Sequence, residues 1–213
     1  MLLTTAFSVR MYDLINEKND LGIDVSAYQK AVDWEKVKAD GKKFAILRTT
    51  VKGGDMDSTF EENYKNAKNA GLEVSGYHYS YSLSTSEATA AAENLVTLLK
   101  GKIIPIYIDL EWGTQGEKSK RVVTDIAKAF ITKMKASGYE ANVYSNKNWY
   151  NNYFYPGELK DLGCKFWIAA YGTNDGTQQE KYRPNVGEYI WQYTDKGKCS
   201  GVNGSCDLDV KCK

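Results

Sequence analysis

Short apolar segments alternate with helix-like polar patterns along most of the 213-residue chain. The apolar runs predict strands at 22–28 (GIDVSAY), 44–50 (FAILRTT), 73–82 (EVSGYHYSYS), 102–112 (KIIPIYIDLEW) and 141–146 (ANVYSN). The segments between them predict helices at 33–41, 57–70, 84–100 and 118–137. Such an alternation is typical of β/α units, in which each helix returns the chain to the next parallel strand.

Two of these helices carry specific signals. Ser84 and Glu87 form an S-x-x-E capping pattern ahead of an Ala- and Leu-rich segment. Residues 118–137 place apolar side chains three and four positions apart, as one buried helix face requires. These side chains are Val122, Val123, Ile126, Ala127, Phe130, Ile131 and Met134.

The pattern changes in the last third of the chain. Strands are predicted at 165–171 (KFWIAAY), 188–194 (EYIWQYT) and 207–210 (DLDV), and no long helix separates them. Near-continuous apolar strands argue for a parallel sheet covered on its faces. We therefore predict an α/β fold, an irregular TIM-barrel-like β/α barrel of eight strands with about five helices. It spans residues 21–213 as one domain, after a leader or linker at 1–20.

Composition excludes several classes of partner. The chain has 28 basic and 27 acidic side chains, so no global positive field favours nucleic acid or anionic lipid. No run approaches the roughly 20 apolar residues that span a bilayer, and the N-terminal MLLTTAFSV is a poor signal peptide. Cys199 and Cys206 flank a Gly- and Ser-rich turn, so a hairpin disulfide is one expectation and free thiols are the other.

Acidic residues gather where strands are predicted to end, which is the edge that carries the active site in β/α barrels. Asp109 and Glu111 are two positions apart on a strand, so their side chains point the same way, about 6–7 Å apart along the chain. Like charges held close raise one proton affinity, and an apolar setting adds to that shift. One group can then stay protonated while its neighbour stays ionised, as glycoside hydrolysis requires.

Two further acids belong to the first and last strands. Asp24 lies in the first and Asp207 begins the last, and these strands are neighbours in a closed barrel. The four acids could therefore share one site, either for glycoside hydrolysis or for a divalent cation. Because the chain has one histidine and no paired CxxC, we expect neither a metal nor another cofactor.

Aromatic side chains follow the same strands. The chain has sixteen Tyr and five Trp, whose flat apolar faces and polar handles suit the faces of a sugar. About half of those on strands are expected in the core. The candidate substrate-binding residues are Tyr28, Tyr77, Tyr79, Tyr144, Trp167, Tyr171, Trp191 and Gln192. His78, between tyrosines on a strand, is predicted to be a hydrogen-bonded structural residue.

These segments, in this order and spacing, resemble glycoside hydrolase family 25, the Chalaropsis-type lysozymes of bacterial autolysins and phage endolysins. The resemblance runs from about Leu21 to Val210 and includes GIDVSAYQKAVDWEKVK, GYHYSYS, PIYIDLEW, FWIAAY, WQYT and the closing GSCDLD. This chain differs from many relatives after the second strand, where it has Val51-Lys52-Gly53-Gly54 in place of an acidic or Gly-rich turn. It also has Asp209 where the family often has Asn.

The resemblance implies a barrel with five helices that hydrolyses the β-1,4 bond between N-acetylmuramic acid and N-acetylglucosamine with net retention. Glu111 matches the general acid/base, and Asp109 matches the carboxylate that orients or stabilises the substrate acetamido group or acts directly as nucleophile. Asp24 and Asp207 match the other acids of the site. The partner would be bacterial peptidoglycan, met outside the cell or in the wall, with a monomer as the default state.

Two other functions stay open from the sequence. A chitinase-like hydrolase would use the same acetamido assistance, but the longer D-x-x-D-x-D-x-E strand of that class is missing before Glu111. A catalytically silent glycan-binding barrel is the second alternative, although all four acids are present. No wall-binding repeat module is visible after the barrel.

Overall fold

The computed structural model describes residues 20–212, so the leader or linker predicted at 1–20 lies outside the described residues except for Asp20. In the described part of the chain, no helix is both long enough and apolar enough to cross a bilayer.

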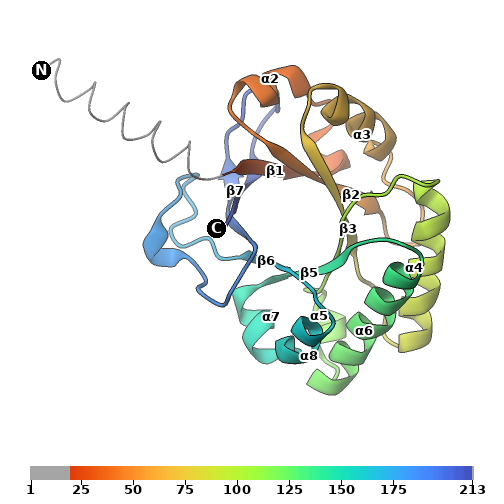
Figure 1. The fold of residues 1–213 in the computed structure, drawn as a ribbon. Coiled ribbons are helices and arrows are strands. Elements are labelled where there is room, and N and C mark those ends of the chain that lie inside the picture. The colour runs from red at the N-terminus through yellow and green to blue at the C-terminus, as the bar shows by residue number, and fades with distance from the viewer. Residues whose placement is uncertain (1–19, 213) are drawn as a thin grey trace, which may run out of the picture.

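Eight strands close into a single barrel in which each strand pairs with its neighbours in chain order (Figure 1). They are β1 (Leu21–Val25), β2 (Phe44–Thr50), β3 (Glu73–Tyr79), β4 (Ile106–Asp109), β5 (Ala141–Asn146), β6 (Phe166–Ala169), β7 (Ile190–Gly197) and β8 (Cys206–Lys211). Every strand predicted from the sequence is present at its expected place, which confirms the eight-stranded barrel.

The last strand departs from the predicted parallel sheet. β8 runs antiparallel to both β7 and β1, whereas β1 to β7 are parallel to one another. The connection 198–205 is shorter than the dozen or so residues that a parallel crossover needs, and it turns through positive φ angles at Gly201 and Gly204. A hairpin is therefore the only geometry that this connection allows.

Helices cover the outside of the barrel between β1 and β6, and two 3₁₀ turns complete the described elements (Figure 1). They are η1 (Ala27–Gln29), α2 (Trp34–Ala39), α3 (Phe60–Asn69), α4 (Thr85–Leu99), α5 (Gly113–Gly116), α6 (Lys120–Ala136), α7 (Lys147–Asn152), α8 (Pro156–Asp161) and η2 (Glu180–Tyr182). The described residues thus form seven α-helices rather than five. Four of them lie at the helix ranges predicted from the sequence, and the three without a predicted range, α5, α7 and α8, are one to two turns long.

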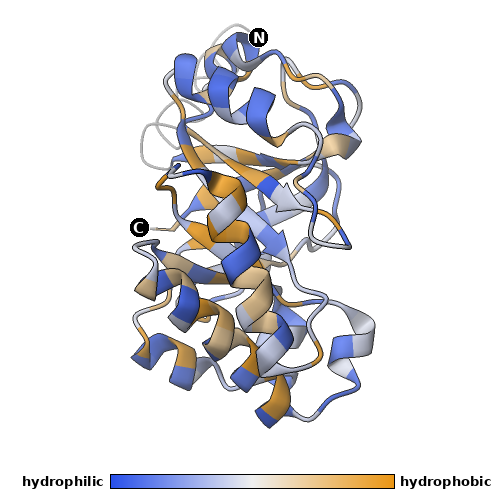
Figure 2. Cartoon of the chain, turned by 90° about the vertical axis from the view of Figure 1, so that its right-hand side faces the viewer, coloured by the Kyte–Doolittle hydropathy of each residue, from blue (hydrophilic) through white to orange (hydrophobic). Residues whose placement is uncertain are grey.

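The two longest helices begin as the sequence predicts. The Ser84 side chain caps α4 by accepting a hydrogen bond from the Glu87 amide, and the Glu87 carboxylate accepts one from the Leu83 amide at 2.7 Å. α6 buries the predicted apolar face against α4 and the sheet, except that Val122 is exposed. Figure 2 shows hydrophilic and hydrophobic stretches on these covering helices, as expected for helices with one face on a core.

Strand alternation divides the apolar side chains into two layers. One set faces the helices and forms the main core. The other fills the barrel interior with Phe44, Ile46, Tyr107, Tyr144, Trp167, Ala169 and Ile190. Because successive side chains on a strand point to opposite faces, the residues two positions further along each strand also face inward. These inward positions build the pocket described next.

The four cysteines are free thiols, so the hairpin disulfide expected between Cys199 and Cys206 does not form. The register explains this result. Cys206 pairs across the ladder with Gly197, and Cys199 lies beyond the end of β7. The two cysteines are therefore not cross-strand partners.

Candidate active site

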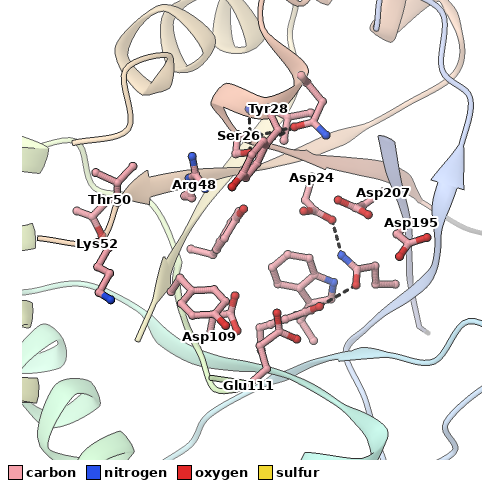
Figure 3. A pocket seen from close by; sticks show the side chains of 18 of the residues that line it. Asp24, Ser26, Tyr28, Arg48, Thr50, Lys52, Asp109, Glu111, Asp195 and Asp207 are labelled. Carbon is pink, nitrogen blue, oxygen red and sulfur yellow. Dashed lines mark hydrogen bonds between the residues drawn. The ribbon is translucent and has the colours of Figure 1, made fainter. Parts of the chain in front are cut away.

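A pocket of about 700 Å³ opens at the carboxyl ends of the strands (Figure 3). Its lining includes all four predicted acids, seven of the eight predicted substrate-binding residues, and further polar side chains from β2, β7 and the segment after β1. The lining residues are Asp24, Val25, Ser26, Tyr28, Gln29, Arg48, Thr50, Val51, Lys52, Tyr77, Tyr79, Tyr81, Asp109, Glu111, Tyr144, Trp167, Tyr171, Gln192, Asp195 and Asp207. The pocket thus lies at the strand-end edge where the sequence predicts the site.

Asp109 and Glu111 lie together on one side of this pocket. Asp109 ends β4 and is 3% exposed, and its Oδ1 atom has no hydrogen-bond partner among the described residues. Burial and then the charge of Glu111 raise the pKa of Asp109 well above its usual range. Burial also raises the pKa of Glu111, and a hydrogen bond from Asn146 lowers it in part. The pair therefore favours binding a proton where ordinary carboxylates are ionised.

Asp24 and Asp207 face each other across the β1–β8 ladder. The Gln192 amide donates a hydrogen bond of 2.6 Å to Asp24 Oδ2, and burial with the charge of Asp207 raises the pKa of Asp24. Burial, followed by the charge of Asp195, raises the pKa of Asp207 to about 6. The closed barrel thus brings the first and last strand acids together, as the sequence predicts.

Gln192 is held by two tyrosines as well as by the acid. Tyr144 and Tyr171 both donate hydroxyl hydrogen bonds to its Oε1, at 2.8 and 2.6 Å. Since the amide nitrogen is fixed on Asp24, the orientation of the whole side chain is determined. This network connects β1, β5, β7 and the segment after β6 across the pocket.

The aromatic residues range from floor to rim. Trp167 packs at the floor with its ring centroid 4.2 Å from that of Tyr144 and 5.9 Å from that of Tyr77. On the β3 side, the ring centroids of Tyr79 and Tyr81 are 4.8 Å apart. Tyr28 is 82% exposed at the rim, and an exposed ring of this kind can stack on a sugar.

Trp191 is the one predicted substrate-binding residue that the structure does not bring to the pocket. It is 1% exposed, packs in the main core and donates a hydrogen bond of 2.8 Å to the Ala170 carbonyl oxygen. Gln192 follows it on the same strand and faces inward, so Trp191 has to face the helices. The two neighbours could not both have lined one pocket.

Several pocket residues were missed from the sequence, among them Arg48, Lys52, Tyr81 and Asp195. Arg48 had a signal, because it is the single charge in an apolar strand and shares the inward phase of Phe44 and Ile46. Tyr81 also had a signal, because it shares the phase of Tyr77 and Tyr79 within the predicted strand 73–82. Asp195 lies on β7 one position beyond the predicted strand 188–194, and Lys52 follows β2, so no predicted periodicity oriented these two side chains.

His78 is structural, as predicted. Its Nδ1 is 2.6 Å from Thr50 Oγ1, its ring stacks on Phe130 at 5.1 Å, and it lies outside the pocket lining. Within residues 20–212, no group of three His, Cys, Asp or Glu side chains has the geometry of a metal site.

A closed β/α barrel whose strand-end pocket combines a carboxyl pair of raised pKa with aromatic walls has the arrangement of a glycoside hydrolase. Comparison with known families agrees, since residues 23–202 match the model of glycosyl hydrolases family 25. The chain belongs to this family.

Two proteins named as lysozymes are similar to this chain and support the assignment. The chain is 32% identical over 192 residues to the autolytic lysozyme of Clostridium acetobutylicum, covering 88% of this chain and 54% of that protein. It is 28% identical over 199 residues to lysozyme M1 of Streptomyces globisporus, covering 87% and 65%. The chain therefore spans between half and two thirds of these relatives.

Among solved structures, a bacterial lysozyme from Streptomyces coelicolor superimposes with a TM-score of 0.72 at 24% identity, over 91% of this chain and 92% of that one. At this identity, the likeness shows the barrel fold.

Proposed function

We propose that this chain is a lysozyme that hydrolyses the β-1,4 bond between N-acetylmuramic acid and N-acetylglucosamine in bacterial peptidoglycan, with net retention. Glu111 acts as general acid and then as general base, and Asp109 orients and stabilises the substrate acetamido group. Asp24 and Asp207 complete the acidic wall. The names of the two curated relatives, both lysozymes, support this reaction, and they favour a place of action at the cell wall.

One observation carries the proposal: Asp109 lines the pocket, and its buried Oδ1 atom accepts no hydrogen bond from the described residues. A buried acceptor without a partner costs on the order of 1–3 kcal/mol, which a substrate donor would recover. The acetamido N–H of an N-acetyl sugar is a donor of the right kind. Its hydrogen bond to Asp109 would turn the acetamido oxygen toward the anomeric carbon.

Substrate binding would also decide which acid holds the proton. Burial raises the pKa of both Asp109 and Glu111 in the pocket. An N–H donated to Asp109 stabilises its ionised form, and a sugar that covers Glu111 removes water and favours its protonated form. Both effects place the proton on Glu111 when the substrate is bound.

The chemistry then follows from this arrangement. Glu111 gives its proton to the glycosidic oxygen as the bond to the anomeric carbon breaks, and the acetamido oxygen forms a bond to that carbon. Water, deprotonated by Glu111, subsequently attacks the same carbon and releases the acetamido group. Two displacements at one carbon give net retention.

The test compares clearance of purified cell walls by wild type, Glu111→Gln and Asp109→Asn, with Glu117→Gln as the control. Glu117 is an exposed glutamate six positions from Glu111 and outside the pocket lining. We expect Glu111→Gln to reduce kcat roughly 10²–10⁴-fold, the usual contribution of general acid–base catalysis, and the control to behave as wild type.

Product analysis identifies the bond. After borohydride reduction, mass spectrometry should find reduced muramic acid at the new ends, and early NMR spectra should show the β-anomer. Reduced N-acetylglucosamine ends would contradict the bond assignment. Binding to walls without clearance by any variant would favour a silent glycan-binding barrel, and turnover of chitin oligomers in preference to walls would favour a chitinase-like enzyme.

A further inference from the structure

Charge is distributed unevenly around the pocket. Its acids, Asp24, Asp109, Glu111, Asp195 and Asp207, come from β1, β4, β7 and β8 or the segments that follow them. Its two basic side chains, Arg48 and Lys52, come from β2 and the turn after it (Figure 3). Both basic side chains of an otherwise acidic pocket therefore lie at one end of it.

Lys52 is exposed, and aromatic rings hold its ammonium group. The Nζ atom lies 5.6 Å from the Tyr81 ring centroid and 5.9 Å from that of Trp112, and these two rings meet edge to face at 5.3 Å. No ion pair within residues 20–212 involves Lys52. Ring faces attract a cation without neutralising it, so this charge is positioned and still available to an anion.

Arg48 is held by an ion pair with Asp57 that uses only part of its guanidinium group. Its Nε atom donates a hydrogen bond of 2.6 Å to Asp57 Oδ2, and its guanidinium carbon lies 5.1 Å from the Tyr28 ring centroid. Asp57 is itself fixed by the Thr59 amide and hydroxyl. The terminal nitrogens of Arg48 make no hydrogen bond among the described residues, so their donors are free to meet a carboxylate.

We propose that Arg48 and Lys52 form a carboxylate-binding subsite that takes the acidic substituent of a muramic acid residue. The inference rests on the proposed function. Of the two alternating sugars, only muramic acid carries a lactyl group, which ends either in its own carboxylate or in a stem peptide that has carboxylates. A cationic subsite at one end of the pocket therefore distinguishes the two sugars and sets which bond lies over Glu111.

The test measures equilibrium binding in the Glu111→Gln background, so that no turnover is needed. Lys52→Gln removes the charge, Lys52→Arg retains it, and Lys181→Gln is the matched control. Lys181 is likewise exposed and lies 4.8 Å from a ring centroid, that of Tyr182, but it is outside the pocket lining. Arg48 is left intact because its removal would leave the carboxylate of Asp57 buried without a counter-charge.

Three soluble glycans separate the sources of the carboxylate: strands with stem peptides, strands stripped of peptide so that the lactyl carboxylate is free, and the stripped strands as methyl esters. We expect Lys52→Gln to weaken binding of a carboxylate-bearing glycan roughly three- to fivefold, the upper part of the range of an exposed ion pair. Lys52→Arg should restore the affinity, and the methyl ester should bind equally well to Lys52→Gln and to its parent.

If Lys52→Gln loses affinity only for the stripped strands, the lactyl carboxylate is the ligand. If it loses affinity only for the peptide-bearing strands, the ligand is a carboxylate of the stem peptide. Equal binding by Lys52→Gln and its parent on all three glycans would overturn the subsite, as would an equal loss in Lys181→Gln. Wild type that binds these glycans but never cleaves them would refute the proposed function and leave the subsite supported by the binding data.

Discussion

Asp209 offers the sharpest test of the electrostatics beneath the pocket. This β8 aspartate is 0% exposed; its Oδ1 accepts a hydrogen bond of 2.8 Å from Trp167 Nε1, and its Oδ2 has no donor among the described residues. Burial raises its pKa well above the usual range, and the charge of Asp207 adds to this effect. The native protein therefore keeps a proton on Asp209 at pH values where the unfolded chain has already released it.

The sign of the effect follows from this difference. As pH rises above the ordinary aspartate pKa of about 4, the unfolded state loses a proton that the native state retains. The contribution of Asp209 to the free energy of unfolding then falls by about 1.4 kcal/mol per pH unit, until the raised native pKa is reached. Asp209→Asn has no such proton and keeps an acceptor for Trp167. The variant should be more stable than wild type, by a margin that grows with pH.

Urea unfolding of both proteins at pH 5, 6 and 7 measures that margin, which should increase by up to about 1.4 kcal/mol per unit. For a domain of this size each kcal/mol corresponds to roughly 2–4 °C in Tm. Asp161→Asn, at an exposed position, controls for the change in net charge. A margin that is negative, or constant across the three pH values, would refute the reasoning.

Three further predictions concern the site and its supports. Asn146→Ser keeps an oxygen to cap α7 but removes the amide that lowers the pKa of Glu111, so the alkaline limb of the pH–activity profile should move to higher pH; an unchanged limb would contradict this. Burial lowers the pKa of His78 to about 4, so the contribution of His78 to the free energy of unfolding should fall by roughly 1.4 kcal/mol per pH unit as pH drops below 6.5 and the unfolded state takes up a proton. Urea unfolding at several pH values should show that this contribution is missing in His78→Gln. Trp191→Phe should lower the free energy of unfolding by about 1–3 kcal/mol with KM unchanged, whereas Tyr28→Ala should raise KM with little change in stability.

The strands and longer helices could be predicted because each carries a periodic signal. α6, for instance, repeats its apolar positions over 17 residues, enough for the pattern to be unambiguous. α7 and α8 have six residues each, too few for an amphipathic repeat to show. The direction of β8 was equally hidden, because the sequence DLDV alternates identically in either direction and only the length of the preceding turn restricts it.

The candidate site could be predicted as far as chain order and strand ends determine it. Asp24 and Asp207 meet because a closed barrel makes its first and last strands neighbours. Trp191 was assigned to the wrong face, although its adjacency to Gln192 required a choice between them. Lys52 could not be placed, because the direction of a turn side chain depends on tertiary contacts, here the rings of Tyr81 and Trp112.

The alternation on β4 and the residues after it shows how one segment serves stability and chemistry at once. Ile108 and Leu110 face the helices in the main core, while Asp109 and Glu111 face the pocket. Burying the acids costs free energy, since burial raises the pKa of both. The apolar side chains of the same segment offset that cost, because removing a buried Leu or Ile costs about 2–5 kcal/mol. The pocket can thus hold several acids of raised pKa because each strand that presents one also anchors the barrel through its opposite face.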